Sequence, residues 1–181
     1  MISHRALLEV ESPFSPLFLV GSQDVIETIV QDLQRLSLTV FSIRGNHSKT
    51  LTALMLEFEK QMSFPSYFGR NKDALNECII DLDWLPTSAG YVLLLSSPDQ
   101  CLVDEGEEEV RWFVSALTDA IATWADPVTV GEPWDRPALP FHVVLTGSQR
   151  EIEHTYRRWE NACGKFPRRN YGGSRAIELG P

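Results

Sequence analysis

Residues 64–86 read FPSYFGRNKDALNECIIDLDWLP, and this stretch combines a turn-rich loop with one helix. Asn71 suits the N-cap of the helix because its side-chain oxygen can accept a hydrogen bond from a free backbone N–H. Pro86 prevents the helical pattern from continuing past Leu85. Apolar side chains recur at helical spacing and are therefore expected to face a core: Leu75, Cys78, Ile79 and Leu82.

The opposite side of this predicted helix carries three acids. Asp73, Glu77 and Asp81 lie at positions i, i+4 and i+8, so their carboxylates line one face. Like charges at this spacing destabilise a helix by roughly tenths of a kcal/mol per pair. Only Asp73, which lies in the first turn, is stabilised by the helix dipole. Charge alone supports equally a solvated face and a contact surface for a cationic partner.

The loop before the helix places aromatic side chains beside the acids. Tyr67 and Phe68 are followed by Gly69, and a rigid ring at this place could stack on a base or a cation of a partner. Each residue also has a purely structural alternative. The two rings could anchor the loop, Gly69 could satisfy a turn, and Asn71 could be only a cap.

Strand and helix patterns alternate around this stretch. Short apolar runs predict buried strands, and apolar residues at helical spacing predict the helices between them. The expected strands lie near 16–20, 38–45, 91–95 and 141–146, and the further helices near 22–33, 48–62, 105–124 and 148–163. The alternation predicts an α/β fold with helices flanking a mainly parallel sheet of three to four strands.

Local signals mark the ends of several elements. We expect Ser22 to cap the first helix, Ser48 to open the second, and Ser148 with Glu151 to form a capping box for the last. The connection 126–140 holds four prolines and an isolated tryptophan, and it is longer than most loops of compact domains. Loops of this length are often functional.

The charge of the chain is unevenly distributed. Its 181 residues hold 16 Lys and Arg against 25 Asp and Glu, a formal net charge of −9. Residues 1–148 hold 9 bases and 21 acids, a net −12, whereas 149–181 hold 7 bases and 4 acids, a net +3. The segment 73–110 has ten acids and no Lys or Arg. This acidity disfavours binding to nucleic-acid phosphates or to an anionic membrane and favours a basic partner.

The remaining composition excludes several classes of protein. Apolar residues make up 43% and charged residues 23%, which is typical of a globular chain and not of a disordered one. No apolar run approaches the roughly 18 residues that span a bilayer. Glu9 and Glu11 stand where a secretory signal would carry an unbroken apolar stretch. We therefore expect a cytoplasmic protein.

Motifs of the common enzyme classes are missing. The four histidines are scattered, and neither a G-x-S-x-G turn nor a phosphate-binding P-loop occurs. The cysteines at 78, 101 and 163 are odd in number and widely spaced, which predicts reduced thiols and no disulfide framework or metal site. We expect Cys78 and Cys163 to be buried in helical patterns. The sequence thus predicts no enzymatic activity, no cofactor and no metal.

One motif resembles a known family. The pattern FPxYFGxNxDALxEC from residue 64, continued by DLDWLP from residue 81, resembles the signature of the barstar family, small acidic inhibitors of secreted microbial ribonucleases. The order of the neighbouring elements extends the resemblance to about 110 residues. The length of the chain predicts one domain over 1–181. Within it, the resemblance implies a barstar-like core at 38–147, and the flanking segments are expected to add an N-terminal strand and helix at 1–37 and a C-terminal helix and basic tail at 148–181.

The resemblance also implies roles for single residues. In that family, the tyrosine matching Tyr67 packs against the catalytic base of the enzyme, and the residues matching Asn71 and Asp73 make polar contacts. An acid matching Glu77 takes the place of the substrate phosphate. A further acidic contact from the next long helix falls on Ala116 or Asp119, depending on the register.

The sequence departs from the best-known member of the family at several of these positions. Asn76 stands where that member has a tryptophan, Glu77 is one methylene longer than its aspartate, and Ile80 and Leu82 replace other contact residues. These departures concern the identity of the enzyme more than the mode of binding. The residues expected to bind the partner are Tyr67, Phe68, Gly69, Asn71, Asp73, Asn76, Glu77, Ile80 and Asp81.

The sequence therefore predicts an inhibitor that blocks a basic ribonuclease with an acidic helix face, as an immunity protein against a bacterial toxin. One alternative is immunity against another cationic toxin, such as a deoxyribonuclease. A second is an RNA-associated module, because residues 156–160 and 165–175 interleave bases with aromatics. A basic tail folded against the acidic body explains the same residues more simply, so direct binding of nucleic acid and of membranes is not expected.

Overall fold

A parallel four-stranded sheet forms the centre of the computed structural model, which describes residues 7–10 and 14–164. The strands are ordered β1-β4-β3-β2, and every neighbouring pair is parallel. Their bounds are Leu17–Leu19 for β1, Thr39–Arg44 for β2, Tyr91–Ser96 for β3 and Phe141–Thr146 for β4. The α/β class and the parallel sheet that the sequence predicts are confirmed.

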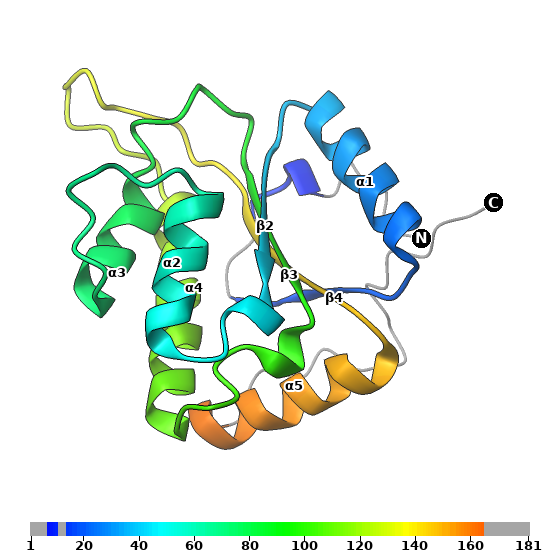
Figure 1. Ribbon diagram of the computed structural model, residues 1–181. Coiled ribbons are helices and arrows are strands. Elements are labelled where there is room, and N and C mark those ends of the chain that lie inside the picture. Colours follow the sequence, from blue (N-terminus) through cyan, green and yellow to red (C-terminus); the bar gives the residue numbers. More distant parts are fainter. Residues whose placement is uncertain (1–6, 11–13, 165–181) are drawn as a thin grey trace.

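Helices cover both faces of this sheet. Figure 1 shows α1 on one side, α2, α3 and α4 on the other, and α5 across one end of the strands. The helix bounds are Gln23–Arg35 for α1, Leu51–Gln61 for α2, Lys72–Asp81 for α3, Glu107–Ala125 for α4 and Gln149–Cys163 for α5. Two short 3-10 turns, η2 at Gly45–His47 and η3 at Pro98–Gln100, follow β2 and β3.

Successive residues of the central strands feed two separate cores. In β3, Tyr91, Leu93 and Leu95 pack in the cluster on the α2–α4 side, whereas Val92 and Leu94 pack on the α1 side. Because successive side chains of a strand point to opposite faces, a run of apolar residues is what a strand covered on both sides requires.

The ends of the helices confirm some of the predicted caps and correct others. The Asn71 side chain accepts from the Ala74 N–H at 2.9 Å, and Ser148 with Glu151 forms the complete capping box. Ser22 occupies the N-cap of α1, but its side chain makes no capping hydrogen bond. The sequence pattern therefore predicted the start of this helix correctly, but it wrongly predicted a capping hydrogen bond from the Ser22 side chain.

Two predictions about buried and capping residues are wrong. Ser48 does not open α2: it is buried after η2, its hydroxyl donates to the Arg44 carbonyl at 3.0 Å, and Thr50 caps the helix. Cys163 is exposed at the C-terminal end of α5, whereas Cys78 is buried as expected. In the last turn of a helix the helical period still holds, but the core no longer covers the side chain.

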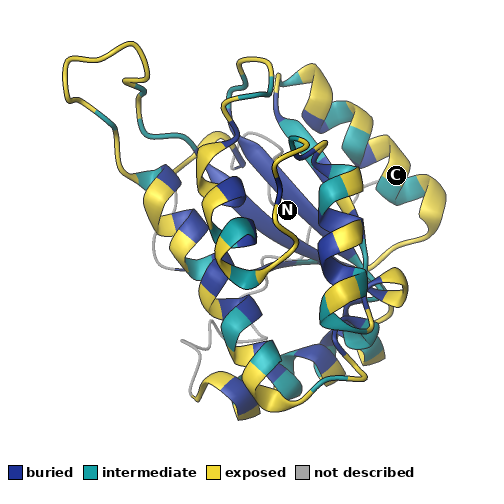
Figure 2. Cartoon of the chain, turned by 60° about the vertical axis from the view of Figure 1, so that its left-hand side comes forward, coloured by how far each residue is buried: buried dark blue, intermediate teal, exposed yellow. Residues whose placement is uncertain are grey.

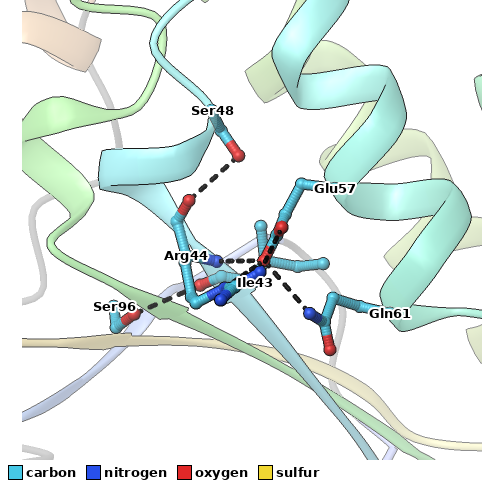
Figure 3. A network of polar contacts seen from close by, with 6 residues as sticks. All are labelled: Ile43, Arg44, Ser48, Glu57, Gln61 and Ser96. Carbon is cyan, nitrogen blue, oxygen red and sulfur yellow. Dashed lines mark hydrogen bonds and ion pairs between the residues drawn. The ribbon is translucent and has the colours of Figure 1, made fainter.

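A charged pair closes the carboxyl end of β2 (Figure 3). Glu57 of α2 is 5% exposed and accepts from Arg44 Nε at 2.7 Å and from Arg44 Nη2 at 2.8 Å. The Arg44 N–H and the Gln61 side chain also donate to this carboxylate, each at 3.2 Å. Burial raises the pKa of Glu57, but the hydrogen bonds and the charge of Arg44 outweigh burial and hold it below its usual value.

Candidate functional site

The helix α3 exposes one acidic face and buries the other side. Leu75, Cys78 and Ile79 lie in the core, while Asp73, Glu77 and Asp81 are exposed. These three residues are called the acid face below. Among the described residues, none of the three forms an ion pair. The burial pattern expected of this helix is confirmed, and its acids remain uncompensated.

Contacts at both ends fix α3 on its neighbour α4. The Trp124 indole donates to the Ile79 carbonyl at 3.0 Å near the C-terminal end. At the N-terminal end, Lys72 lies 3.9 Å from a Glu109 carboxylate oxygen and 5.4 Å from the centre of the Trp112 ring. Lys72 therefore interacts with α4 and does not pair with the carboxylates of the acid face.

Aromatic packing holds the loop that precedes α3. The rings of Phe64 and Phe68 are both buried, with centroids 4.7 Å apart. Phe64 also meets Trp84 edge-on at 5.6 Å, and the Trp84 indole donates to the Met62 carbonyl at 3.1 Å. These contacts tie the start of the loop to the segment that follows α3.

An ion pair fixes the other end of the loop. Arg70, which adopts a left-handed φ of 49°, donates from Nε and Nη2 to the two carboxylate oxygens of Glu59 at 2.7 and 2.9 Å. Between these anchors, Tyr67 has a 73% exposed side chain. A rigid aromatic side chain is therefore presented to solvent beside the acid face.

The electrostatics of the site show that its parts lie close together. Partial desolvation and then the charges of Asp83 and Asp81 raise the pKa of the Tyr67 phenol. Although Asp81 is exposed, partial desolvation and the neighbouring Asp83 raise its pKa. Tyr67 therefore lies within electrostatic reach of the C-terminal end of α3, where a cation would relieve the repulsion between the two aspartates.

Residues 38–146 match the family described as Barstar (barnase inhibitor). This segment covers well over half of the chain and contains the whole acid face and the loop before it. The chain belongs to the barstar family. Its α/β architecture agrees with that membership, and the resemblance noted in the sequence is confirmed. A search of curated proteins finds no match.

Two solved structures are similar to this barstar family member at low sequence identity. The ORC2 protein of Aeropyrum pernix in its ADPNP-ADP complexes has a TM-score of 0.52 at 10% identity, and the match covers 83% of this chain and 40% of that one. CDC6P of Pyrobaculum aerophilum has a TM-score of 0.45 at 15% identity, covering 85% and 38%. This chain thus spans less than half the length of those proteins, and the likeness to the ORC2 protein concerns the fold alone.

Seven of the nine residues expected to bind the partner of a barstar family protein are exposed, and Gly69 and Asn71 are two of them. The remaining five exposed residues are Tyr67, Ile80 and the three acids of the acid face. Beside the acid face, the structure exposes Tyr67 and leaves Ile80 37% exposed. The structure thus brings together one aromatic side chain, one apolar side chain and three carboxylates from residues 67–81.

The other four expected residues take structural positions. Phe68 is buried, so its ring anchors the loop. The Asn71 side chain caps α3, and a Cβ at position 69 would lie 2.9 Å from its Nδ2, which favours Gly69 there. Asn76 is half-buried, and among the described residues its Oδ1 is buried without a hydrogen-bond donor. These residues therefore determine the conformation of the loop and the start of α3, and they contribute less to the exposed surface of the site.

Two further acids lie outside the acid face. Asp83 raises the pKa of both Tyr67 and Asp81, whereas the sequence shows it only as one of ten acids in a segment. On α4, Ala116 is 2% exposed and cannot contact a partner, whereas Asp119 is exposed. Asp119 follows Trp112 by two helical turns and so lies on the side of α4 that Lys72 of α3 contacts.

The aromatic residues of the basic C-terminal region pack against the body of the protein where the structure describes them. Trp159 of α5 is 3% exposed, and half-buried Tyr156 meets Phe18 at a tilted angle with centroids 5.4 Å apart. Arg158 donates to the backbone carbonyls of Cys101 and Leu102. Residues 156–160 therefore do not form an RNA-stacking surface, while the tail 165–181 lies outside the described residues.

Within residues 7–10 and 14–164, no cluster of three or more His, Cys, Asp or Glu side chains is arranged to hold a metal ion. No helix in these segments has the length and apolar character needed to cross a membrane.

Proposed function

We propose that this protein inhibits a basic ribonuclease by covering its active site with the acid face and Tyr67. The observation that carries the proposal is a set of three exposed carboxylates, without an ion pair among the described residues, beside an exposed tyrosine on an anchored loop, in a member of the barstar family. The partner is a protein, and the inhibitor itself catalyses no reaction.

The chemistry of a ribonuclease explains why carboxylates suit this task. Such an enzyme collects Lys, Arg and His side chains to bind RNA phosphate. A fixed carboxylate offers the same charge and the same acceptor geometry, but no bond that can be cleaved. Glu77, at the centre of the acid face, takes the place of the phosphate, while Asp73, Asp81 and Asp119 strengthen the negative potential around it.

The neighbouring uncharged residues complete the contact. Tyr67 packs its ring against the catalytic base of the enzyme, and Ile80 supplies apolar area beside it. Phe68, Gly69 and Asn71 hold the loop in the bound shape, and half-buried Asn76 lies on α3 next to Glu77. Because the loop is already fixed by Phe64, Phe68 and Arg70, little conformational entropy is lost on binding.

The biological role that follows is immunity. A cell that makes a secreted ribonuclease toxin needs a cytoplasmic inhibitor until the toxin leaves, and electrostatic steering by an acidic face speeds the capture of a basic enzyme. We propose that this chain protects a bacterium from a toxin made by itself or by its kin.

Inhibition titrations test the proposal. The chain is added to barnase and to the ribonuclease domains encoded nearest to its own gene, and cleavage of a fluorogenic RNA is followed. We expect stoichiometric inhibition of at least one enzyme, weakened by Glu77→Gln but not by Glu107→Gln, an exposed acid in the first turn of α4. If no ribonuclease in this panel is inhibited while a deoxyribonuclease is, the ribonuclease assignment is wrong.

A further inference from the structure

The long connection between α4 and β4 is an ordered hairpin. Val128 and Arg136 pair in antiparallel fashion, with N–H to carbonyl distances of 2.9 and 3.0 Å. At the tip, the Asp135 carboxylate accepts from the N–H groups of Val130 and Gly131, both at 2.9 Å. Gly131 has a φ of 85°, a left-handed conformation that glycine adopts without strain. We call residues 126–137 the hairpin.

Arg136 fixes the base of the hairpin on the end of α4. Its guanidinium lies 4.1 Å from the centre of the Trp124 ring. It also donates to the carbonyls of Thr123 at 2.8 Å and Asp126 at 3.0 Å. Because these groups occupy the guanidinium, Arg136 stabilises the hairpin and contributes little positive charge to its outer surface.

The tip of the hairpin exposes two large apolar side chains. Trp134 and Val130 are each 67% exposed, and among the large hydrophobic residues that the structure describes only Tyr67 is more exposed. The hairpin is held by its own hydrogen bonds, so the exposure of Trp134 is part of an ordered structure. A tryptophan exposed in this way is unfavourable in water. It is also the side chain most enriched at the energetic centres of protein interfaces.

The hairpin continues the site already described. Trp124, on which Arg136 stacks, also donates to the Ile79 carbonyl, next to Ile80 and two residues before Asp81. Figure 1 shows the hairpin (yellow, upper left) projecting beyond the C-terminal ends of α3 and α4, and Figure 2 shows it standing out from the body as a largely exposed loop. A partner seated on the C-terminal part of the acid face therefore lies beside the hairpin.

The charge around the exposed tip identifies the kind of partner. Asp126, Glu132 and Asp135 are exposed on the hairpin, and its one base, Arg136, is engaged at the hairpin base. A second copy of this chain or an RNA would bring further negative charge to the tip. A basic protein surface with an apolar depression complements it.

We infer that the hairpin is a second contact surface for the same ribonuclease, with Trp134 as its anchor. This inference rests on the proposed function and extends it. The acid face occupies the catalytic groove, where related ribonucleases share the groups that bind RNA phosphate, whereas the hairpin contacts the surface outside the groove. The hairpin therefore contributes selectivity for one ribonuclease among several with similar active sites.

Inhibition constants of point variants test the inference against the enzyme most strongly inhibited in the panel above. We expect Trp134→Ala to raise the inhibition constant by about tenfold or more, mainly through faster dissociation because the side chain is uncharged. Val130→Ala should raise it by about two- to fivefold. Val20→Ala, which removes a 52% exposed valine between β1 and α1, serves as the matched control and should leave it unchanged. Thermal unfolding of each variant checks that the fold is intact.

The outcomes separate this inference from the proposed function. If Glu77→Gln weakens inhibition and folded Trp134→Ala does not, the hairpin contact is refuted while the acid face stands. If Trp134→Ala weakens inhibition and Glu77→Gln does not, the hairpin binds the enzyme but the acid face does not block it. In the double variant the two effects should multiply, because distant contacts with one partner contribute independently. If no ribonuclease is inhibited, both proposals fail.

Discussion

Glu57 and Glu77 have the same type of side chain and lie on two consecutive helices, but their surroundings in the structure are opposite. Glu57 of α2 is buried and receives hydrogen bonds from Arg44 and Gln61 (Figure 3). Glu77 of α3 is exposed, and among the described residues it has no ion-pair partner. The first carboxylate stabilises the fold, whereas the second is left available to another molecule.

The acids around each glutamate repeat this contrast. On α2, Glu59 is bound at both oxygens by Arg70. On α3, Asp73, Glu77 and Asp81 repel one another, and Asp83 adds to the repulsion that Asp81 experiences. A helix face that lowers the stability of the free protein is understandable if a cationic partner supplies the missing charge.

The largest expected effect comes from neutralising the central acid. Glu77→Gln keeps the shape of the side chain and removes its charge, so the complex with the ribonuclease should lose about 2–5 kcal/mol of binding free energy. Because Glu77 has no ion-pair partner among the described residues, the free energy of unfolding should stay within about 0.5 kcal/mol. Titration calorimetry and urea unfolding measure the two quantities. A large loss of stability with unchanged binding would reverse the assigned roles of the two glutamates.

Neutralising the buried glutamate should do the opposite. Glu57→Gln leaves Arg44 without its charged partner, so the free energy of unfolding should fall by roughly 2–3 kcal/mol. The pKa of Glu57 is lowered in the folded protein, so its contribution is complete above the usual glutamate pKa of about 4.3 and disappears as the pH falls through the folded value. Urea unfolding between pH 3 and 7 should show a parent–variant difference that shrinks toward acid pH. Inhibition by the folded variant should be unchanged.

A smaller effect is expected from loosening the loop. Arg70→Met removes the two bonds to Glu59 and lets the segment around Tyr67 sample other conformations before binding. The complex should weaken by about 1 kcal/mol, since immobilising the loop now accompanies binding. Lys60→Met, which removes an exposed base from α2, is the control. Equal inhibition constants for the two variants would show that the ion pair does not prearrange the loop.

The smallest effect concerns stability at the end of α3. Partial desolvation and Asp83 raise the pKa of Asp81, so its ionisation destabilises the folded protein once the pH exceeds the usual aspartate pKa of about 3.9. Asp81→Asn should therefore increase the free energy of unfolding by tenths of a kcal/mol at pH 7. The gain should vanish near pH 3, where the aspartate is protonated in both states. Thermal scans at the two pH values make the comparison, and a variant less stable than the parent at pH 7 would contradict it.

Sequence reasoning located the acid face correctly because that face depends only on local spacing. Acids four residues apart share one side of any helix, and the apolar residues between them choose the other side for the core. The Asn71 cap and the Ser148–Glu151 box are local in the same sense, since donor and acceptor lie within three residues.

The features that the sequence did not reveal depend on distant contacts. Arg70 looks like any exposed base until Glu59, eleven residues earlier, is placed beside it. Nothing in the sequence distinguishes Arg136 within a segment of four prolines. Only the structure shows that its guanidinium contacts Trp124 and the carbonyls of Thr123 and Asp126. Phe68 could have been an exposed contact or an anchor, and only the position of Phe64 decided between them.

Hydrogen exchange of the complex tests the central claim most directly. The chain is mixed with an inhibited ribonuclease, and the exchange of its backbone amides is compared with that of the free protein. The acid face and its loop predict slower exchange over residues 65–83, with α1 and α5 unchanged. Protection confined to α1 or α5, with 65–83 exchanging as in the free protein, would show that this protein binds its partner through another surface.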